Sequence, residues 1–510
     1  MDLIMEYSRT EFAKLNIIFA YLKKIILIIL EFIIRIYFLE KIGKEILGVN
    51  GVFVNILQVL SLAELGVNNV ILYSFYEPLA YKNQEKIQAL VLFYQSIYRN
   101  IAFFIFLIGI LIAPFLKYII NANLDYSYLY TIYFLFLFNS VISYFFIYKN
   151  SILKADQKAY ISTKIEILIL VLKGIFQIIL LNIFASFIIY LFVEIISTFL
   201  NNFLISKTVE KKYNYLNSIE NKRLSVEEKK NITNLIKAGF IYKISGVLLN
   251  STNNILISII VSTVMVGYYL NYNTIYSGLA SFYVVLFNSL TPSIGNLIAT
   301  DDKKQKYKIF KIVLLIGSWL GIVFSISYFL LVNDFVILWI GEEFVLKENI
   351  VFIISIMMYI SCILHPIYTF REATGLYMKV KYIMLLAAVI NIILSAILGL
   401  YKGLFGIFLG NIITTIITYF WYEPIILYQD CFNIRGKEYF KFRIKDSINY
   451  IFVFLFIEIL SKSLFIANTW LLWVLKAFFV FLILNIICLI IYKDTDEFVF
   501  IKNKIKKCLY

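Results

Sequence analysis

The chain has 510 residues, of which 61% are hydrophobic and 15% charged, and its formal net charge is +15. Soluble globular proteins are about 45–50% apolar and about 25% charged, so this chain has too little charge to cover soluble domains. Four widely spaced cysteines exclude a disulfide scaffold, and a single histidine leaves almost nothing for a zinc cluster or a Ser-His-Asp triad. We expect an integral membrane protein without a metal or other cofactor.

Fourteen segments are long and apolar enough to cross the roughly 30 Å hydrocarbon core as helices. Runs such as Ile101–Ile112 and Phe478–Ile491 are apolar on every face and too long for the short alternating strands of a membrane barrel. The sequence therefore predicts an all-α integral membrane protein with 14 transmembrane helices. In chain order the expected spans are 19–39, 46–66, 98–120, 127–148, 163–183, 186–206, 236–258, 263–290, 309–332, 349–370, 380–400, 404–427, 447–466 and 470–492.

The positions of the basic residues predict the orientation. An even number of spans places both termini on one side, and with both termini cytoplasmic nearly all lysines and arginines outside the spans fall in inner loops. The positive charge is spread over every inner loop, so topology explains it better than nucleic-acid binding does, and no nucleic-acid partner is expected. Acidic residues precede the first span and no cleavage site follows it, so we expect that span to be retained.

Charge and repetition predict the domain organisation. The second and eighth expected spans open at Gly48 and Gly267, and similarly spaced polar turns follow at 83–86 and 301–304. This indicates two pseudo-symmetric six-helix lobes, as in transporters with a site between repeats, although two unrelated hairpins would look alike. The expected divisions are an N-lobe at 1–206, a cytoplasmic linker at 207–234, a C-lobe at 235–428, a cytoplasmic loop at 429–446, and a C-terminal helix pair with its tail at 447–510.

Polar residues inside the spans are the candidate site. On the first helix, Lys24, Glu31 and Arg35 are seven and four residues apart and therefore share one face. Charges in hydrocarbon usually face a cavity or a partner, and an arginine offers a planar fork for phosphate. The alternative is that Glu31 and Arg35 only neutralise each other.

The seventh helix repeats this spacing with Lys243, Asn250 and Asn254. Such a stripe either joins helices or lines a wet pathway. Equivalent polar positions occur on the second and eighth helices, where amides are suited to bind sugar hydroxyls. These residues are Gln58 and Glu64 on the second helix and Asn273 and Asn288 on the eighth.

Lys173 and Glu194 are expected at similar depth on adjacent antiparallel helices. We predict a buried ion pair between them, with either a structural or a proton-exchanging role. Glu31 and Glu64 are the candidate carriers of a coupling proton.

Three stretches resemble a known family: LGVNGVFVNILQVLSLAELGVNNVILYSFYEPLAYKNQEKIQALVLFYQSIYR at 47–99, VGYYLNYNTIYSGL at 266–279 and TPSIGNLIATDDKKQKYKIF at 291–310. They resemble the bacterial polysaccharide (oligosaccharide-lipid) flippases of the multidrug/oligosaccharidyl-lipid/polysaccharide exporter superfamily. The resemblance covers at least residues 20–430, and spans in the order six, six and two fit the family.

The resemblance implies two lobes that enclose a central cavity and alternate between inward-open and outward-open states. The implied cargo is an undecaprenyl-diphosphate-linked oligosaccharide, flipped across the bacterial cytoplasmic (inner) membrane for a cell-surface polysaccharide. Arg35 matches the arginine that the family has in its first helix, whereas Lys243 is our extension from helical spacing. Besides the lipid bilayer, the candidate partners are the polysaccharide polymerase and glycosyltransferases of the same pathway.

Three alternatives remain open. A peptidoglycan-precursor flippase of the same superfamily also has fourteen spans. A drug/cation antiporter would be better matched by twelve spans and an acidic cavity. A membrane polysaccharide polymerase, an enzyme, would be expected to have a large external loop with catalytic residues, and the expected outer loops are all short. We therefore expect a transporter and not an enzyme.

Overall fold

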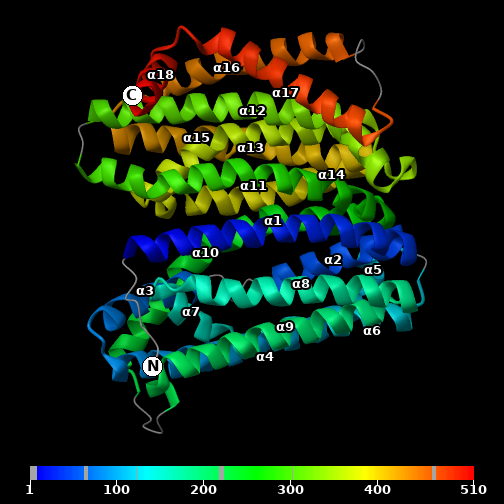
Figure 1. Cartoon of the computed structure of the whole chain (residues 1–510), viewed down its shortest axis with the longest axis vertical. Coiled ribbons are helices and arrows are strands. Elements are labelled where there is room, and N and C mark those ends of the chain that lie inside the picture. Colours follow the sequence, from blue (N-terminus) through cyan, green and yellow to red (C-terminus); the bar gives the residue numbers. More distant parts are fainter. Residues whose placement is uncertain are drawn as a thin grey trace. The chain divides into compact units, whose positions relative to one another are not determined.

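All regular structure in the described residues is helical in this computed structural model, which describes residues 9–61, 67–122, 124–217, 223–300, 303–461 and 467–509. Contacts within the chain divide it into two compact units, unit 1 at 1–267 and unit 2 at 268–510. The colours of Figure 1 identify their helices.

Unit 1 contains ten α-helices among its described residues. They are α1 (Arg9–Lys41), α2 (Lys44–Leu60), α3 (Val67–Ala80), α4 (Gln84–Ile112), α5 (Leu116–Ile119), α6 (Tyr126–Ser143), α7 (Ile147–Ala155), α8 (Ala159–Phe184), α9 (Phe187–Lys212) and α10 (Val226–Ile260).

Unit 2 begins within α11 and continues to the last described helix. One long helix, α14, is broken at Gly403, whose positive φ of 58° a residue without a side chain adopts readily. The helices are α11 (Thr263–Thr300), α12 (Lys303–Ile340), α13 (Glu348–Thr374), α14 (Tyr377–Ile417), α15 (Tyr419–Leu427), α16 (Lys437–Ser461), α17 (Trp470–Tyr492) and α18 (Asp496–Leu509).

Each of the fourteen expected spans falls mainly on helical residues wherever the structure describes it. The expected span at 127–148 is not straight, because α6 and α7 meet there at a 44° bend. By length and composition, seven of the described helices are able to cross a membrane, or eight if that bent pair is one span. The count of fourteen and the side of the termini remain predictions.

Helix boundaries support the internal repeat. The starts of α2 and α11, at Lys44 and Thr263, have the same separation in the sequence as the ends of α1 and α10, at Lys41 and Ile260. Two matching boundaries favour a repeat over a coincidence between two hairpins, so we interpret the first helices of each half as equivalents.

Two glycines bring the repeated helices into contact. A Cβ atom at Gly48 of α2 would lie 1.8 Å from the carbonyl oxygen of Thr263, and one at Gly267 of α11 would lie 2.4 Å from that of Lys44. Since Lys44 and Thr263 are equivalent helix starts, the contact is reciprocal. Small residues allow such close approach of membrane helices.

The contact-defined boundary follows Gly267, so α10 belongs to unit 1. The expected C-lobe instead began at residue 235. The two divisions use different criteria. The units are defined by contacts within the folded chain, whereas the expected lobes are defined by the sequence repeat. The lobe boundaries therefore remain a prediction.

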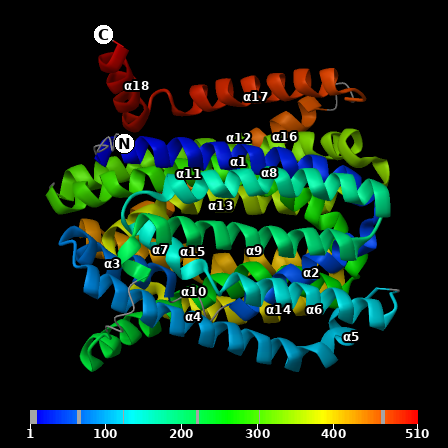
Figure 2. The same ribbon diagram turned by 60° about the horizontal axis from the view of Figure 1, so that its bottom comes forward.

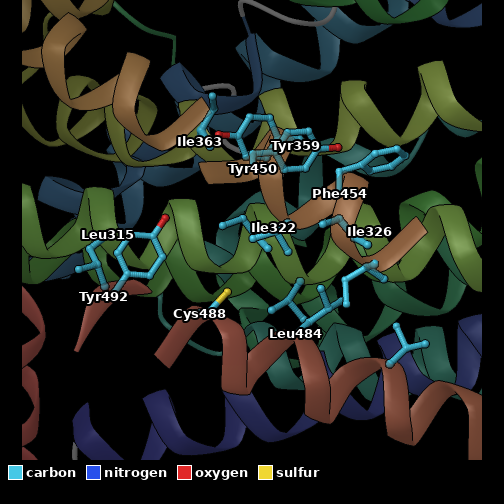
Figure 3. Packing of buried hydrophobic residues seen from close by; sticks show 14 of the residues in the cluster. Leu315, Ile322, Ile326, Tyr359, Ile363, Tyr450, Phe454, Leu484, Cys488 and Tyr492 are labelled. Carbon is cyan, nitrogen blue, oxygen red and sulfur yellow. The ribbon is translucent and has the colours of Figure 1, made fainter. Parts of the chain in front are cut away.

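A hydrophobic cluster joins α16 and α17 to α12 and α13 in unit 2 (Figure 3). Leu484 and Cys488 of α17 are fully buried in it, and the rings of Tyr359 and Tyr450 stack with centroids 3.9 Å apart. The opposite face of α17 exposes Leu471 at 70%. A helix that is apolar on its exposed face as well is typical of a membrane span.

The amino-terminus of α10 carries a capping box. Glu228 N donates to Ser225 Oγ at 3.1 Å, and Ser225 N donates to Glu228 Oε2 at 2.9 Å. The backbone hydrogen bond from Ser225, assisted by Lys86, lowers the pKa of the Glu228 carboxyl from its usual value. A carboxyl with a lowered pKa stabilises the folded state above its unfolded pKa, and this contribution is lost as pH falls through the folded pKa.

Ser225→Ala is therefore expected to destabilise the start of α10 by about 1 kcal/mol. Amide hydrogen exchange over residues 226–230 is the measurement, and we expect faster exchange after correction for intrinsic rates. In the unmodified protein the same amides are expected to lose protection as acid protonates Glu228. Thr233→Ala, in the exposed part of the same helix, is the control, and equal exchange in both variants would contradict the capping role.

Candidate functional site

The polar face of α1 is held beside α8 by close packing. A Cβ atom at Gly174 of α8 would lie 2.9 Å from Leu30 Cδ2, so the glycine allows α1 to approach. Lys23 Nζ pairs with Glu166 Oε2 at 2.6 Å, and Asn16 Nδ2 donates to the Gln157 carbonyl at 2.8 Å. These contacts fix the rotation of α1 about its own axis.

Charged side chains of α1, α8 and α9 meet in what we call the cationic cluster. The predicted ion pair is present, with Lys173 Nζ 3.1 Å from both oxygens of Glu194. Glu31 is within electrostatic reach of Lys24, Arg35 and Lys173. The cluster consists of Lys24, Glu31, Arg35, Lys173 and Glu194.

The cluster has one more cation than carboxylates. Glu194 accepts from Lys173 and also from Gln177 Nε2 at 3.2 Å. Glu31 is exposed and Arg35 half-buried. Charges inside apolar helices are costly unless they are compensated. The site is therefore mostly neutralised from within but retains a cationic excess, which suits an anionic ligand.

A polar seam joins α2 to α10. Asn55 Nδ2 donates to the Ser251 carbonyl at 2.9 Å, and Ser251 Oγ donates to Gln58 Oε1 at 3.0 Å. Asn254 is buried, and its Oδ1 has no hydrogen-bond partner among the described residues. Gln58 thus joins two helices, which is the first of the two roles predicted for the polar residues. The side-chain amide oxygen of Asn254 can still accept a hydrogen bond from a ligand.

The side chains of three predicted site residues lie outside what the structure describes. Glu64 is one of them, and of Lys243 and Asn250 only the backbone within α10 is described. By the repeat, Lys243, Asn250 and Asn254 are the equivalents of Lys24, Glu31 and Arg35.

The polar residues of α11 are the part of the predicted site in unit 2. Tyr269 OH donates to Asn273 Oδ1 at 3.4 Å, and Asn288 is exposed. The structure therefore brings the five members of the cationic cluster together and places Gln58 in the polar seam between α2 and α10, whereas Asn254 is buried in α10. Asn273 is hydrogen-bonded to Tyr269, one helical turn before it.

Sequence reasoning missed three ion pairs of unit 2 in which both side chains are mostly shielded from solvent. Arg371 Nη1 lies 2.7 Å from Glu423 Oε1, and Arg443 Nη1 lies 3.3 Å from Asp446 Oδ2. These four side chains are all buried. The sequence placed Arg443 and Asp446 in the loop at 429–446, but α16 already begins at Lys437.

The third missed pair joins Lys476 Nζ to Asp334 Oδ2 at 2.7 Å. Asp334 was expected in an outer loop, but α12 continues to Ile340 and includes it. A lysine in the middle of the apolar run at 470–492 was the signal that a carboxylate partner lay nearby.

No group of three or more His, Cys, Asp or Glu side chains suited to a metal occurs within the described ranges. His365 Nδ1 lies 2.8 Å from the Ser361 carbonyl, and its ring packs against Tyr283 with centroids 4.9 Å apart. The single histidine is thus a packed side chain of unit 2.

No family model and no curated protein matches the sequence. Solved structures do match. The lipid II flippase MurJ in an inward closed conformation has a TM-score of 0.64 at 17% identity, covering 94% of this chain and 99% of that one. An inward-facing multidrug resistance MATE family transporter of the MOP superfamily has 0.60 at 14%, covering 78% and 93%. A mutant of the Vibrio cholerae MATE transporter VcmN has 0.56 at 13%, covering 80% and 94%.

The chain thus has the fold of MOP-superfamily transporters and flippases, which confirms the resemblance at the level of the fold. Together with the apolar helices, this fold identifies a multi-pass membrane protein.

Proposed function

We propose that this protein is a flippase that moves undecaprenyl-diphosphate-linked oligosaccharides across the bacterial inner membrane by alternating access. The observation that carries the proposal is the cationic cluster in the apolar helices α1, α8 and α9. A diphosphate is strongly disfavoured in hydrocarbon. Cations at membrane depth lower that barrier while the prenyl tail remains in lipid.

In the proposed mechanism, Arg35 binds the diphosphate with its planar guanidinium and Lys24 assists on the same helical face. Lys243 supplies the equivalent cation of the second repeat. Protonation of Glu31 or Glu64 would release positive charge toward the phosphate, which couples transport to a proton. The amides of Gln58, Asn250, Asn254, Asn273 and Asn288 bind the sugars.

Arg35→Gln is expected to reduce surface polysaccharide at least about tenfold in a strain that lacks its own flippase, because a charged hydrogen-bonding partner is worth about 1.5–3 kcal/mol. The measurement is cell-surface polysaccharide at equal membrane-protein level. Arg35→Lys is expected to be intermediate, since lysine keeps the charge but loses the fork.

Lys41→Gln is the matched control, because Lys41 is at the end of the same helix and pairs with Glu40 at 2.7 Å. Undiminished polysaccharide with Arg35→Gln would remove Arg35 from the mechanism.

A peptidoglycan-precursor flippase is the second candidate. The MurJ structure aligns with 94% of the chain, compared with 78% and 80% for the two MATE transporters described above. A cationic site suits this cargo equally well, because it is also a lipid diphosphate, whereas a cationic drug would be repelled. Rescue of a strain lacking its peptidoglycan flippase, without rescue of a polysaccharide-flippase mutant, would decide for the second candidate.

A polymerase is tested separately. Incubating the purified protein with lipid-linked sugar is expected to relocate the substrate without lengthening it. Chain growth would instead identify an enzyme.

A further inference from the structure

A basic cavity of 490 Å³ lies between the first turns of α12 and the helix α18, both in unit 2. Its α12 side carries Lys304, Lys308 and Lys311. Phe500 and Asn503 are on its α18 side. The cavity is remote in sequence from every residue of the cationic cluster, and nothing in the proposed transport cycle uses it.

The packing of α18 forms the cavity. Phe498 stacks on Trp319 with centroids 6.0 Å apart and an interplanar angle of 11°, and Ile501 packs against the hydrophobic cluster of α12, α13, α16 and α17. These contacts use the apolar face of α18. The face that bears Phe500 and Asn503 therefore turns toward the lysines of α12.

The depth of the cavity follows from the two membrane helices beside it. The first residues of α12 are KKQKYKIFK, and its uninterrupted apolar run begins at Ile312. The apolar run of α17 ends at Tyr492, and Figure 2 shows α18 turning away from the direction of α17 after that point. Both spans thus leave the hydrocarbon at the cavity, which places it among lipid headgroups. Tyr307 in its wall is typical of that region.

The charges in the cavity are unequally compensated. Lys311 Nζ pairs with Glu497 Oε1 at 2.9 Å, whereas Lys308 Nζ lies 4.5 Å from the centre of the Phe500 ring. Asp496, the other carboxylate of the cavity, is in the first turn of α18, where the helix dipole stabilises negative charge. The wall that contains Lys304 and Lys308 is left with an excess of positive charge.

We propose that this cavity binds the phosphate headgroup of an anionic phospholipid. Lys304 and Lys308 hold the phosphate, the Asn503 amide donates to the headgroup, and the acyl chains lie along the apolar surfaces of α12 and α17. Basic pockets between membrane helices recognise anionic headgroups in this way. The bound lipid bridges α12 and α18 and so stabilises the docked position of α18.

Native mass spectrometry of the full-length protein with phosphatidylglycerol or phosphatidylcholine vesicle lipids tests the proposal. We expect phosphatidylglycerol to be retained preferentially. The double variant Lys304→Gln/Lys308→Gln is expected to reduce its retention at least about tenfold, because each lysine contributes electrostatic attraction at the membrane surface. The control Lys441→Gln/Lys445→Gln removes the same charge from exposed positions of α16 and is expected to retain the lipid.

Two results would overturn the proposal. Equal loss of phosphatidylglycerol in both double variants would mean that only general surface charge attracts the lipid. Protection of Lys308 from acetylation by inorganic phosphate as effectively as by phosphatidylglycerol would mean a site for free phosphate and not for a lipid. If the lysine variant does not fold, Asn503→Asp, which adds a negative charge to the wall, is expected to lower retention, and unchanged retention would equally overturn the proposal.

Discussion

Arg443→Leu is expected to destabilise the protein by about 3–5 kcal/mol, because it leaves the Asp446 carboxylate buried without its cation. Arg443 Nη1 donates to Ser318 Oγ at 2.9 Å, and Nη2 donates to the Ile363 carbonyl at 2.7 Å. Asp446 accepts from the hydroxyls of Tyr359 and Tyr492, at 3.1 and 2.5 Å. One variant therefore disturbs α12, α13, α16 and α17 together.

Thermal unfolding in detergent, followed by circular dichroism, is the measurement. Lys445→Leu is the matched control, because Lys445 is two residues further along α16 and exposed. Arg443→Leu/Asp446→Leu is expected to recover much of the lost stability, since apolar replacement of a whole buried pair is often neutral or stabilising. A single variant no less stable than Lys445→Leu would show that the pair contributes little.

Gly48→Ala is expected to have the second large effect, a destabilisation of about 1–3 kcal/mol or more from overpacking. The added Cβ would meet the backbone oxygen of Thr263 at 1.8 Å. A flexible side chain would rotate away from such a clash, but a helix backbone moves only as a whole. We therefore expect the crossing of α2 and α11 to open.

Gly278→Ala is the control for this prediction. It is also within a helix, but a Cβ atom there meets nothing within 4 Å, so we expect it to be neutral or slightly stabilising because alanine favours helix. The unfolding midpoint and the amount of monodisperse protein are the measurements. Equal midpoints for Gly48→Ala and Gly278→Ala would contradict the close crossing.

Helical periodicity and span position account for the successful part of the site prediction. Lys24, Glu31 and Arg35 share a face because their spacing is close to whole turns of a helix. Lys173 and Glu194 meet because they lie at the same depth in two adjacent antiparallel helices, α8 and α9. Both arguments need only the local geometry of helices and the thickness of the membrane.

The same reasoning failed for Arg443, Asp446 and Asp334. It assigned charged residues near span ends to water, where an isolated charge is most stable. Paired charges can be buried instead, because an ion pair with further hydrogen bonds compensates the loss of hydration. Whether a partner is present depends on α12, α13 and α17, which are distant in sequence, and no local pattern contains that information.

Composition, helical period and the spacing of Gly48 and Gly267 were sufficient to predict a helical membrane protein with an internal repeat, since these depend on solvent and on residues near one another in the chain. Packing alone determined which helices touch, and therefore which charges are paired, which glycines are crowded and where a basic cavity forms beside α18. Such contacts join segments hundreds of residues apart, and their energies depend on three-dimensional shape, which a linear pattern does not encode.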